Sequence, residues 1–263
     1  MMKLPANVAR PVASDWTEAT GGPQNRGDRY VYPKGLPERV IGANVSELAP
    51  GHMGCPLHLH LFEEEHFLML QGSMTVRELA PDAADYTEYT LRAGELVAYA
   101  AGTGIAHRFQ SRHDPADATL GPAVMLCVSN RVAGEVCEYP DSGKTMVKGL
   151  RGVGVLGGDG PTDAYFAARR ARARSRSVVE LSDADRPAHV AGPTRVDEVD
   201  LGGAFGLPLA RAAGAGQVFL NVDRLPPGGR TGPLHAHTAD EELVYVISGS
   251  PTLRQLRGGR FED

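Results

Sequence analysis

The chain contains two copies of one 36-residue segment, and this internal repeat constrains its fold more than any other feature. Residues 44–79 and 221–256 align without a gap at an offset of 177 (221 − 44), with 16 identical positions. The shared residues include a Pro-Leu-His-x-His core, a pair of glutamates and a Gly-Ser turn. Such a match indicates a tandem duplication, so the fold is built from two related units.

The residues of the first copy and those that follow it are typical of β-structure. His58 and His60 are two residues apart, so on a strand they share one face. Gly 32 and Pro 19 among 263 residues supply many turns, which favours a sandwich or barrel over a helical bundle. Short strands separated by turns are predicted at residues 65–71, 75–79, 86–91, 96–100, 107–110 and 123–130.

A different kind of sequence separates the repeats. Residues 161–174 (PTDAYFAARRARAR) are typical of a short linker helix, and five arginines lie in it or just after it. These arginines suit either a nucleic-acid or phosphate contact or a solvated surface. Acidic residues follow at once and the net charge is −5, so we favour the solvated surface and expect no nucleic-acid partner. The arginines are Arg169, Arg170, Arg172, Arg174 and Arg176.

The sequence shows no signal for a membrane. No apolar run approaches the ~18 residues that span a bilayer, and the first 18 residues lack the apolar core of a signal peptide. The cysteines are Cys55, Cys127 and Cys137, an odd number without a CxxC pair. We therefore expect reduced thiols in a cytoplasmic protein, with Cys55 as a small buried residue.

One group of histidines and a glutamate carries the chemistry. In the pattern His58-x-His60-x4-Glu65, two imidazoles share a strand face and the carboxylate begins the next strand. His107 follows a strand and a glycine-rich turn, and it could be a fourth ligand. Imidazoles with a carboxylate suit Fe, Mn, Ni, Co or Zn. Because an ionised Glu65 facing an apolar barrel is costly without a partner, metal binding explains the pattern better than a metal-free core.

These segments resemble the motifs of the cupin superfamily. Residues 58–72 fit the latter part of its first motif, G-x5-H-x-H-x(3,4)-E-x6-G. Residues 94–107 fit its second motif, G-x5-P-x-G-x2-H-x3-N, with Ala100 in place of the proline. The resemblance implies an all-β jelly-roll barrel (a double-stranded β-helix), duplicated as in bicupins, and it implies a homodimer. It also implies that one metal ion is bound by His58, His60, Glu65 and His107.

The second repeat carries the matching triplet His235, His237 and Glu242. Its fourth ligand would fall near residue 284 (107 + 177), beyond Asp263, so we expect a truncated, partial second barrel. We expect this part to be marginally stable, or to be completed by the N-terminal arm or by a second chain. The predicted divisions are an N-terminal arm (1–35), a first barrel (36–150), a linker with a short helix (151–212) and a partial second barrel (213–263).

Strand alternation predicts what lines the first barrel. If the ligands face inward, Phe67, Met69 and Phe109 also face inward and Arg108 faces outward. Such a lining is apolar and has no arginine to hold a phosphate, which disfavours a sugar-phosphate substrate and favours another small organic molecule. Glu64 and Glu241 precede the ligand glutamates and point the other way, so they are expected to be surface or supporting groups.

Two functions remain open. The first is a metal-dependent enzyme acting on a small organic molecule, of the dioxygenase, decarboxylase or isomerase type. The second is a non-catalytic module that binds a metal or a small ligand. No general base is identified, because His66 has the wrong parity and Tyr99 is better explained as a packed aromatic. No helix-turn-helix pattern accompanies the barrels, which argues against a DNA-binding regulator.

Overall fold

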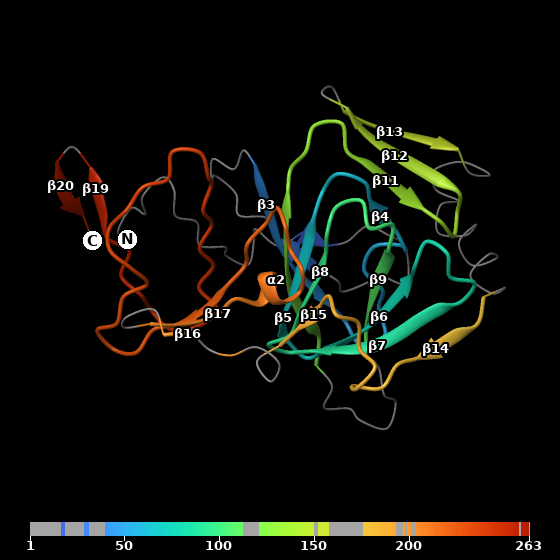
Figure 1. Ribbon diagram of the computed structural model, residues 1–263, viewed down its shortest axis with the longest axis horizontal. Helices are drawn as coiled ribbons and strands as arrows, with labels where there is room; N and C mark the ends of the chain where they lie inside the picture. The colour runs from blue at the N-terminus through green and yellow to red at the C-terminus, as the bar shows by residue number, and fades with distance from the viewer. Residues whose placement is uncertain are drawn as a thin grey trace.

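The structure of the chain is a computed structural model that describes residues 17–18, 29–31, 40–112, 121–149, 152–157, 176–192, 197, 199–200, 204–257 and 259–262. These residues are almost entirely β-structure, and their one helix is α2 (Leu209–Ala212) (Figure 1). No helix among them is long and apolar enough to cross a bilayer. The predicted linker helix at residues 161–174 lies outside the described residues.

Two antiparallel sheets face each other and form the barrel of the first repeat. Successive strands alternate between the sheets, with β6 and β7 joined as a hairpin, and this is the jelly-roll order. The first sheet has the order β3 (Ile41–Leu48), β10 (Ala123–Asn130), β5 (Glu65–Gln71) and β8 (Leu96–Tyr99). The second has the order β7 (Tyr86–Arg92), β6 (Ser73–Leu79) and β9 (Ala106–Ser111), with β4 (Leu59–His60) beside β9 through a bridge between His58 and His107. The all-β jelly-roll prediction is confirmed.

The predicted strand bounds agree with the observed ones to within two residues. Strand β5 contains an unbroken run of apolar residues because apolar neighbours pack against both of its faces, and such a run is recognisable in the sequence. Phe67 and Met69 belong to the core inside the barrel, whereas Leu68 belongs to a second apolar cluster on the outer face of the sheet. Strand β10 is divided in the same way, with Met125 inside and Leu126 outside.

The hairpin between β5 and β6 requires a glycine. Gly72 has a φ of 73°, in the left-handed region that side chains other than glycine rarely adopt. A Cβ atom at this position would also lie 3.2 Å from the Cα atom of Ala123. Gly249, the equivalent residue of the second repeat, has a φ of 82° with no atom within 4 Å of such a Cβ.

Several short strands flank or extend the two sheets of the jelly roll. They come from the predicted arm, from the end of the predicted barrel and from the predicted linker. Strands β2 (Arg29–Val31) and β1 (Thr17–Glu18) continue the first sheet from β3, and β15 (Val190–Ala191) continues it from β8. Strand β14 (Val178–Glu180) pairs parallel to β7. A separate sheet has the order β13 (Gly152–Gly157), β12 (Lys144–Gly149), β11 (Val136–Tyr139) and β4.

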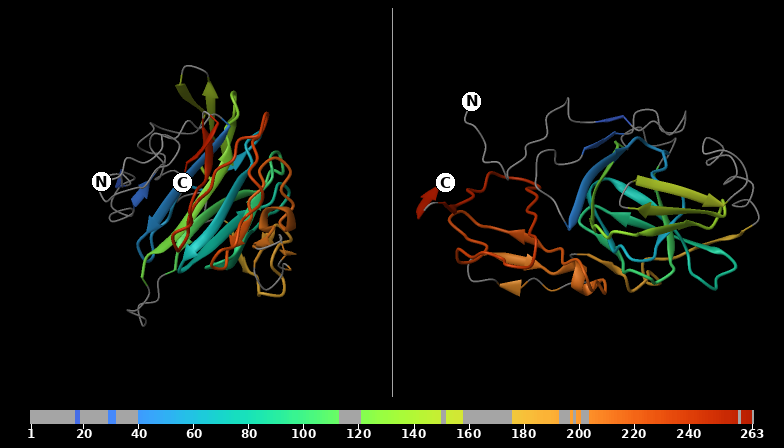
Figure 2. Two further views of the ribbon diagram at one scale, coloured as in Figure 1. Left: turned by 90° about the vertical axis from the view of Figure 1, so that its left-hand side faces the viewer. Right: turned by 90° about the horizontal axis from the view of Figure 1, so that it is seen from above.

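Residues 204–262 lie beside the barrel along the long axis of the molecule (Figures 1 and 2). Residues 225–254 contain no assigned strand. Val244 is 74% exposed, whereas its counterpart in the first repeat, Phe67, is 5% exposed. The described residues from 199 onward form the short strands β16 (Val199–Asp200), β17 (Phe205–Leu207), β18 (Val222–Arg224), β19 (Gln255–Arg257) and β20 (Arg260–Glu262).

The two parts meet on the outer face of the first sheet. Helix α2 and the residues after it bury Leu209, Val218 and Leu220 against the outward side chains of β3, β5, β8 and β10. Glu64 supports this contact from the loop before β5. Its carboxylate accepts hydrogen bonds from the backbone N–H groups of residues 216–218, and it pairs with His66.

Candidate metal centre

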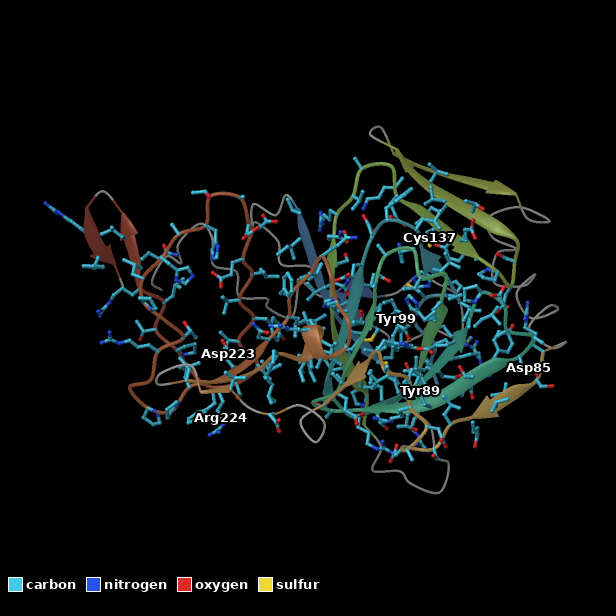
Figure 3. The ribbon with its side chains drawn as sticks, viewed as in Figure 1. Asp85, Tyr89, Tyr99, Cys137, Asp223 and Arg224 are labelled. Carbon is cyan, nitrogen blue, oxygen red and sulfur yellow. The ribbon has the colours of Figure 1, made fainter. Side chains whose placement is uncertain are left out.

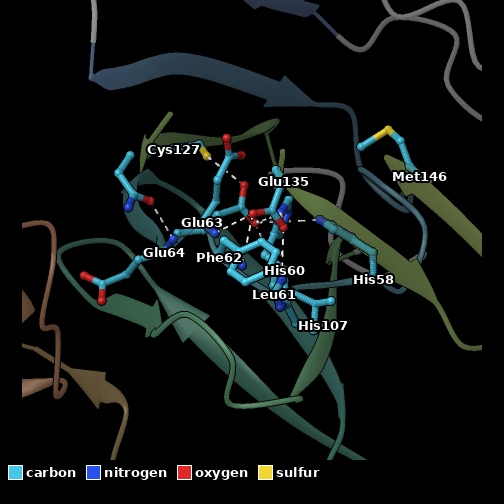
Figure 4. A network of polar contacts seen from close by, with 12 residues as sticks. His58, His60, Leu61, Phe62, Glu63, Glu64, His107, Cys127, Glu135 and Met146 are labelled. Atoms are coloured by element: carbon cyan, nitrogen blue, oxygen red, sulfur yellow. Dashed lines mark hydrogen bonds and ion pairs between the residues drawn. The ribbon is translucent and has the colours of Figure 1, made fainter. Parts of the chain in front are cut away.

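Three imidazole nitrogens of the first repeat point at one carboxylate oxygen. The Nε2 atoms of His60, His107 and His58 lie 3.2, 3.3 and 3.7 Å from Oε2 of Glu65. His58 and His107 are buried, and the other two side chains are nearly so. The structure therefore brings all four predicted ligands of the first repeat to one point, and Figure 4 labels the three histidines among them.

Three elements position these side chains. The backbones of His58 and His107 exchange two hydrogen bonds, of 3.1 and 2.7 Å, which set β4 beside β9. His60 ends β4, two residues from His58, so both rings lie on the same side of the strand. Glu65 begins β5 in the opposite sheet. The four ligand groups thus come from both sheets of the barrel.

The electrostatics of the group favour an ionised glutamate among imidazoles. Burial raises the pKa of Glu65, but hydrogen bonds from His107, His58 and His60 outweigh it and hold that pKa well below 4.5. Burial lowers the pKa of His60, and Glu65 more than offsets this and raises it to about 9. Burial dominates at His107 and lowers its pKa to about 4, so this imidazole stays neutral.

The remaining ring nitrogens have acceptors that fix how two imidazoles are oriented. Nδ1 of His58 lies 2.6 Å from the carbonyl oxygen of Pro56, which can only accept a hydrogen bond. Nδ1 of His60 lies 3.3 Å from Oε1 of Glu135. Both Nδ1 atoms therefore donate, so a metal ion bound at Nε2 would replace the proton that each ring shares with Glu65.

Glu135 was not predicted from the sequence, although it supports the site directly. Besides His60, its carboxylate accepts backbone hydrogen bonds from residues 61–63 (Figure 4). These bonds hold the loop between β4 and β5, which connects His60 to Glu65. Glu135 lies outside both repeats, so no spacing in the sequence connects it with His60.

A second buried carboxylate, Glu78, was also missed. Its Oε1 atom accepts hydrogen bonds from Tyr89, Tyr99 and His189 at 2.6, 2.7 and 2.8 Å. Tyr99 in turn stacks on His107, with ring centroids 3.7 Å apart. The parity of β6 could have found Glu78, because it shares the inward face with Met74 and Val76. Tyr99 is a buried aromatic, as the sequence interpretation favoured.

The second triplet repeats the local geometry in an exposed setting. Nε2 of His235 and of His237 lie 3.9 and 3.6 Å from Oε2 of Glu242. Nδ1 of His235 lies 2.8 Å from the carbonyl oxygen of Pro233, as His58 does with Pro56. All three ligand side chains are exposed. The structure brings the three predicted residues together without the enclosure found in the first repeat.

The rest of the barrel lining follows the predicted alternation of inward and outward side chains. Phe67, Met69 and Phe109 belong to the core inside the barrel. Arg108 alternates along β9 with the inward residues His107 and Phe109, and its Nη1 atom contacts the sulfur of Met53.

The expectation that Cys55 is buried is wrong, because it lies exposed in the loop before His58.

No family model and no curated protein matches the chain. Solved structures do match it. A sugar phosphate isomerase of the cupin superfamily from Silicibacter pomeroyi has 22% identity over 52% of this chain and 82% of its own, with a TM-score of 0.43. A putative sugar phosphate isomerase from Acidithiobacillus ferrooxidans has 22% identity over 50% and 78%, with a TM-score of 0.41. An oxalate decarboxylase from Lactobacillus farciminis has 16% identity over 77% and 60%, with a TM-score of 0.45. These values are too low to carry an argument about activity, and the fold assignment rests on the strand order.

Proposed function

We propose that the chain is a cupin-superfamily protein in which His58, His60, Glu65 and His107 bind one divalent first-row transition metal. The observation that carries this proposal is the convergence of three Nε2 atoms on one buried carboxylate oxygen. The donor set fits Fe, Mn, Ni, Co or Zn. An ionised carboxylate inside a barrel needs compensating charge, and a bound cation supplies it.

The chain's own residues prepare this site. Pro56 and Glu135 hold two imidazoles with Nε2 toward Glu65, and Phe67 and Phe109 pack beside the ligands and exclude water. A bound metal would polarise a ligand oxygen or lower the pKa of a water molecule. We propose that the protein is a metal-dependent enzyme acting on a small organic molecule, of the dioxygenase, decarboxylase or isomerase type.

The alternative is a non-catalytic module that binds a metal or a small ligand. One observation favours it. Tyr99 and Glu78 are hydrogen-bonded to each other, and burial and the charge of Glu78 raise the pKa of Tyr99 well above 10. Neither group is then poised to act as a general base near pH 7. Consumption of oxygen or substrate by the metal-loaded protein would support the enzyme, and tight binding without turnover would support the module.

The second repeat and the cysteines support two further proposals. We propose that His235, His237 and Glu242 form a second, weaker metal site, because their local geometry matches that of the first. None of the three cysteines, all of which the structure describes, forms a disulfide bond, which supports a cytoplasmic location. A homodimer without nucleic-acid or membrane partners remains a prediction.

Elemental analysis tests the metal proposal. The wild type and His58→Ala are purified without added metal and then reconstituted with Fe, Mn, Ni, Co or Zn. We expect about one tightly held metal per chain in the wild type and its loss in His58→Ala. His52→Ala is the control, because His52 belongs to none of the candidate ligand groups found among the described residues. No metal in the wild type after reconstitution would refute the proposal.

A further inference from the structure

Cys137 lies at the edge of the candidate metal centre. It is on β11, directly opposite His60 on β4 in an antiparallel pair, so the two side chains are on the same side of that sheet. Its sulfur and one ring nitrogen from each of His58 and His60 all lie within 4.8 Å of one another. Cys137 has no exposed surface, and Figure 3 marks its position.

The other two cysteines do not share this position. Cys127 is also buried near the site, but its sulfur lies 3.9 Å from Oε1 of Glu65, on the oxygen that the imidazoles do not approach. It belongs to no candidate ligand group among the described residues. Cys55 is exposed. Cys137 is therefore the thiol placed to reach an ion held between the histidines.

A buried thiol at this position is neutral when no metal is bound. Burial raises the pKa of Cys137 to about 12, and the negative charges of Glu65 and Glu135 act in the same direction. A cation held by His58 and His60 would reverse this balance, because coordination removes the thiol proton.

We propose that Cys137 is an additional ligand of the metal bound in the first barrel, contributing a thiolate sulfur on the side of His58 and His60. The S–H bond breaks, the proton leaves to the buffer, and a sulfur–metal bond forms without any change in oxidation state. A thiolate favours thiophilic ions such as Zn or Co over Mn. It also occupies a position that three histidines and one carboxylate would leave open. This inference rests on the proposed metal site.

Cobalt(II) is the probe, because its complexes with thiolates absorb in the near ultraviolet through sulfur-to-metal charge transfer and its complexes with nitrogen and oxygen alone do not. Bound cobalt is counted by elemental analysis in the same samples. We expect one cobalt per first-barrel site in the wild type and in Cys137→Ser, with the charge-transfer band lost in the variant. Cys127→Ser is the matched buried control and should keep the band.

The outcomes separate the two proposals. Wild type that takes up cobalt without the band refutes the role of Cys137 and leaves the histidine site intact. A band that disappears in Cys127→Ser rather than in Cys137→Ser also refutes it. Wild type that takes up no cobalt refutes the metal site itself. If the Cys137 variants do not fold, zinc X-ray absorption on the wild type decides, since a sulfur ligand lies at about 2.3 Å and nitrogen or oxygen at about 2.0–2.2 Å.

Discussion

Glu64 and Glu241 make the same contact from opposite repeats. Glu64 accepts backbone hydrogen bonds from residues 217–218, including 2.9 Å from the N–H of Val218. Glu241 accepts them from residues 40–41 at 2.8 and 2.7 Å. Both the two glutamates and the two pairs of donors are 177 residues apart in sequence. The repeats therefore contact each other reciprocally, each glutamate reaching the first strand region of the other copy.

Removing these carboxylates should have unequal effects. Glu64 is buried, so Glu64→Ala leaves buried N–H donors without an acceptor, at a cost of about 1–3 kcal/mol. Glu241→Ala should cost less, because its bond to Val40 is exposed to water. Chemical denaturation measures both, and hydrogen exchange of residues 216–218 should quicken in Glu64→Ala alone. Equal exchange in the two variants would contradict this reading of the contact.

Glu135→Gln should weaken metal binding without removing a ligand. The amide keeps an acceptor oxygen for the backbone but loses the charge that faces Nδ1 of His60. Loss of such support typically reduces metal affinity by about 10–100-fold. Competition with a chelator measures the affinity, and Glu138→Gln, an exposed glutamate on β11, serves as the control. Unchanged affinity would show that Glu135 only supports the loop.

Glu78 should make the fold sensitive to acid. Burial raises its pKa, but bonds from His189, Tyr89 and Tyr99 outweigh this and lower it below 4.5. In acid the unfolded chain binds a proton at this residue before the folded chain does. The stabilisation is therefore complete above pH 4.5 and is lost as pH falls through the lowered pKa.

Glu78→Gln should accordingly lose stability less steeply than the wild type as pH falls from about 5 to 3. Denaturant titrations at several pH values provide the slopes. Glu180→Gln changes an exposed carboxylate on β14 and should keep the wild-type slope. A wild-type slope in Glu78→Gln would show that other carboxylates determine the acid response.

Gly72→Ala and Gly249→Ala form a matched pair. Both positions have positive φ, which costs a non-glycine residue about 1–2 kcal/mol. Only at Gly72 would the new Cβ also crowd another chain segment, 3.2 Å from Ala123. We expect the larger loss of thermal stability in Gly72→Ala. A larger loss in Gly249→Ala would mean that the turn at Gly249 is packed more tightly than its surroundings indicate.

Limited proteolysis tests the expected weakness of the second repeat. Phe219 and Tyr245 are 71% and 42% exposed. The described aromatic residues between 40 and 130 are buried except Phe62, which is 51% exposed in a loop whose backbone Glu135 holds. Chymotrypsin should therefore cut after Ala212 well before it cuts within residues 40–130, with mass spectrometry identifying the sites. If the segment after Ala212 resists as long as the barrel does, it is covered by another part of the protein or by a second copy.

Local sequence pattern was sufficient to predict most of the fold and three of the four proposed metal ligands. The strands of the barrel were predictable because alternation and turn residues act over a few positions. His58, His60 and Glu65 lie within eight residues, so their spacing alone indicated a shared site. His107 was a candidate because it follows a strand and a glycine-rich turn, and the motif resemblance then implied its role as a ligand.

Contacts between distant strands were not predictable. Glu135 meets His60 only because β11 lies beside β4, and Glu78 meets His189 only because the chain returns past β8. Cys137 faces His60 for the same reason as Glu135. Nothing in the spacing of these residues along the chain specifies which strands become neighbours.

Strands β14 and β15 have a practical consequence for work on the isolated first barrel. They lie on the outer edges of β7 and β8, one in each sheet of the jelly roll. A recombinant fragment ending at residue 150, the predicted end of the first barrel, keeps every proposed ligand of the first metal site but leaves both edges open to intermolecular pairing. A fragment extended through Leu220 retains β14 and β15 and also the residues that cover the outer face of the first sheet, and it is the version suited to crystallisation or to spectroscopy at high concentration.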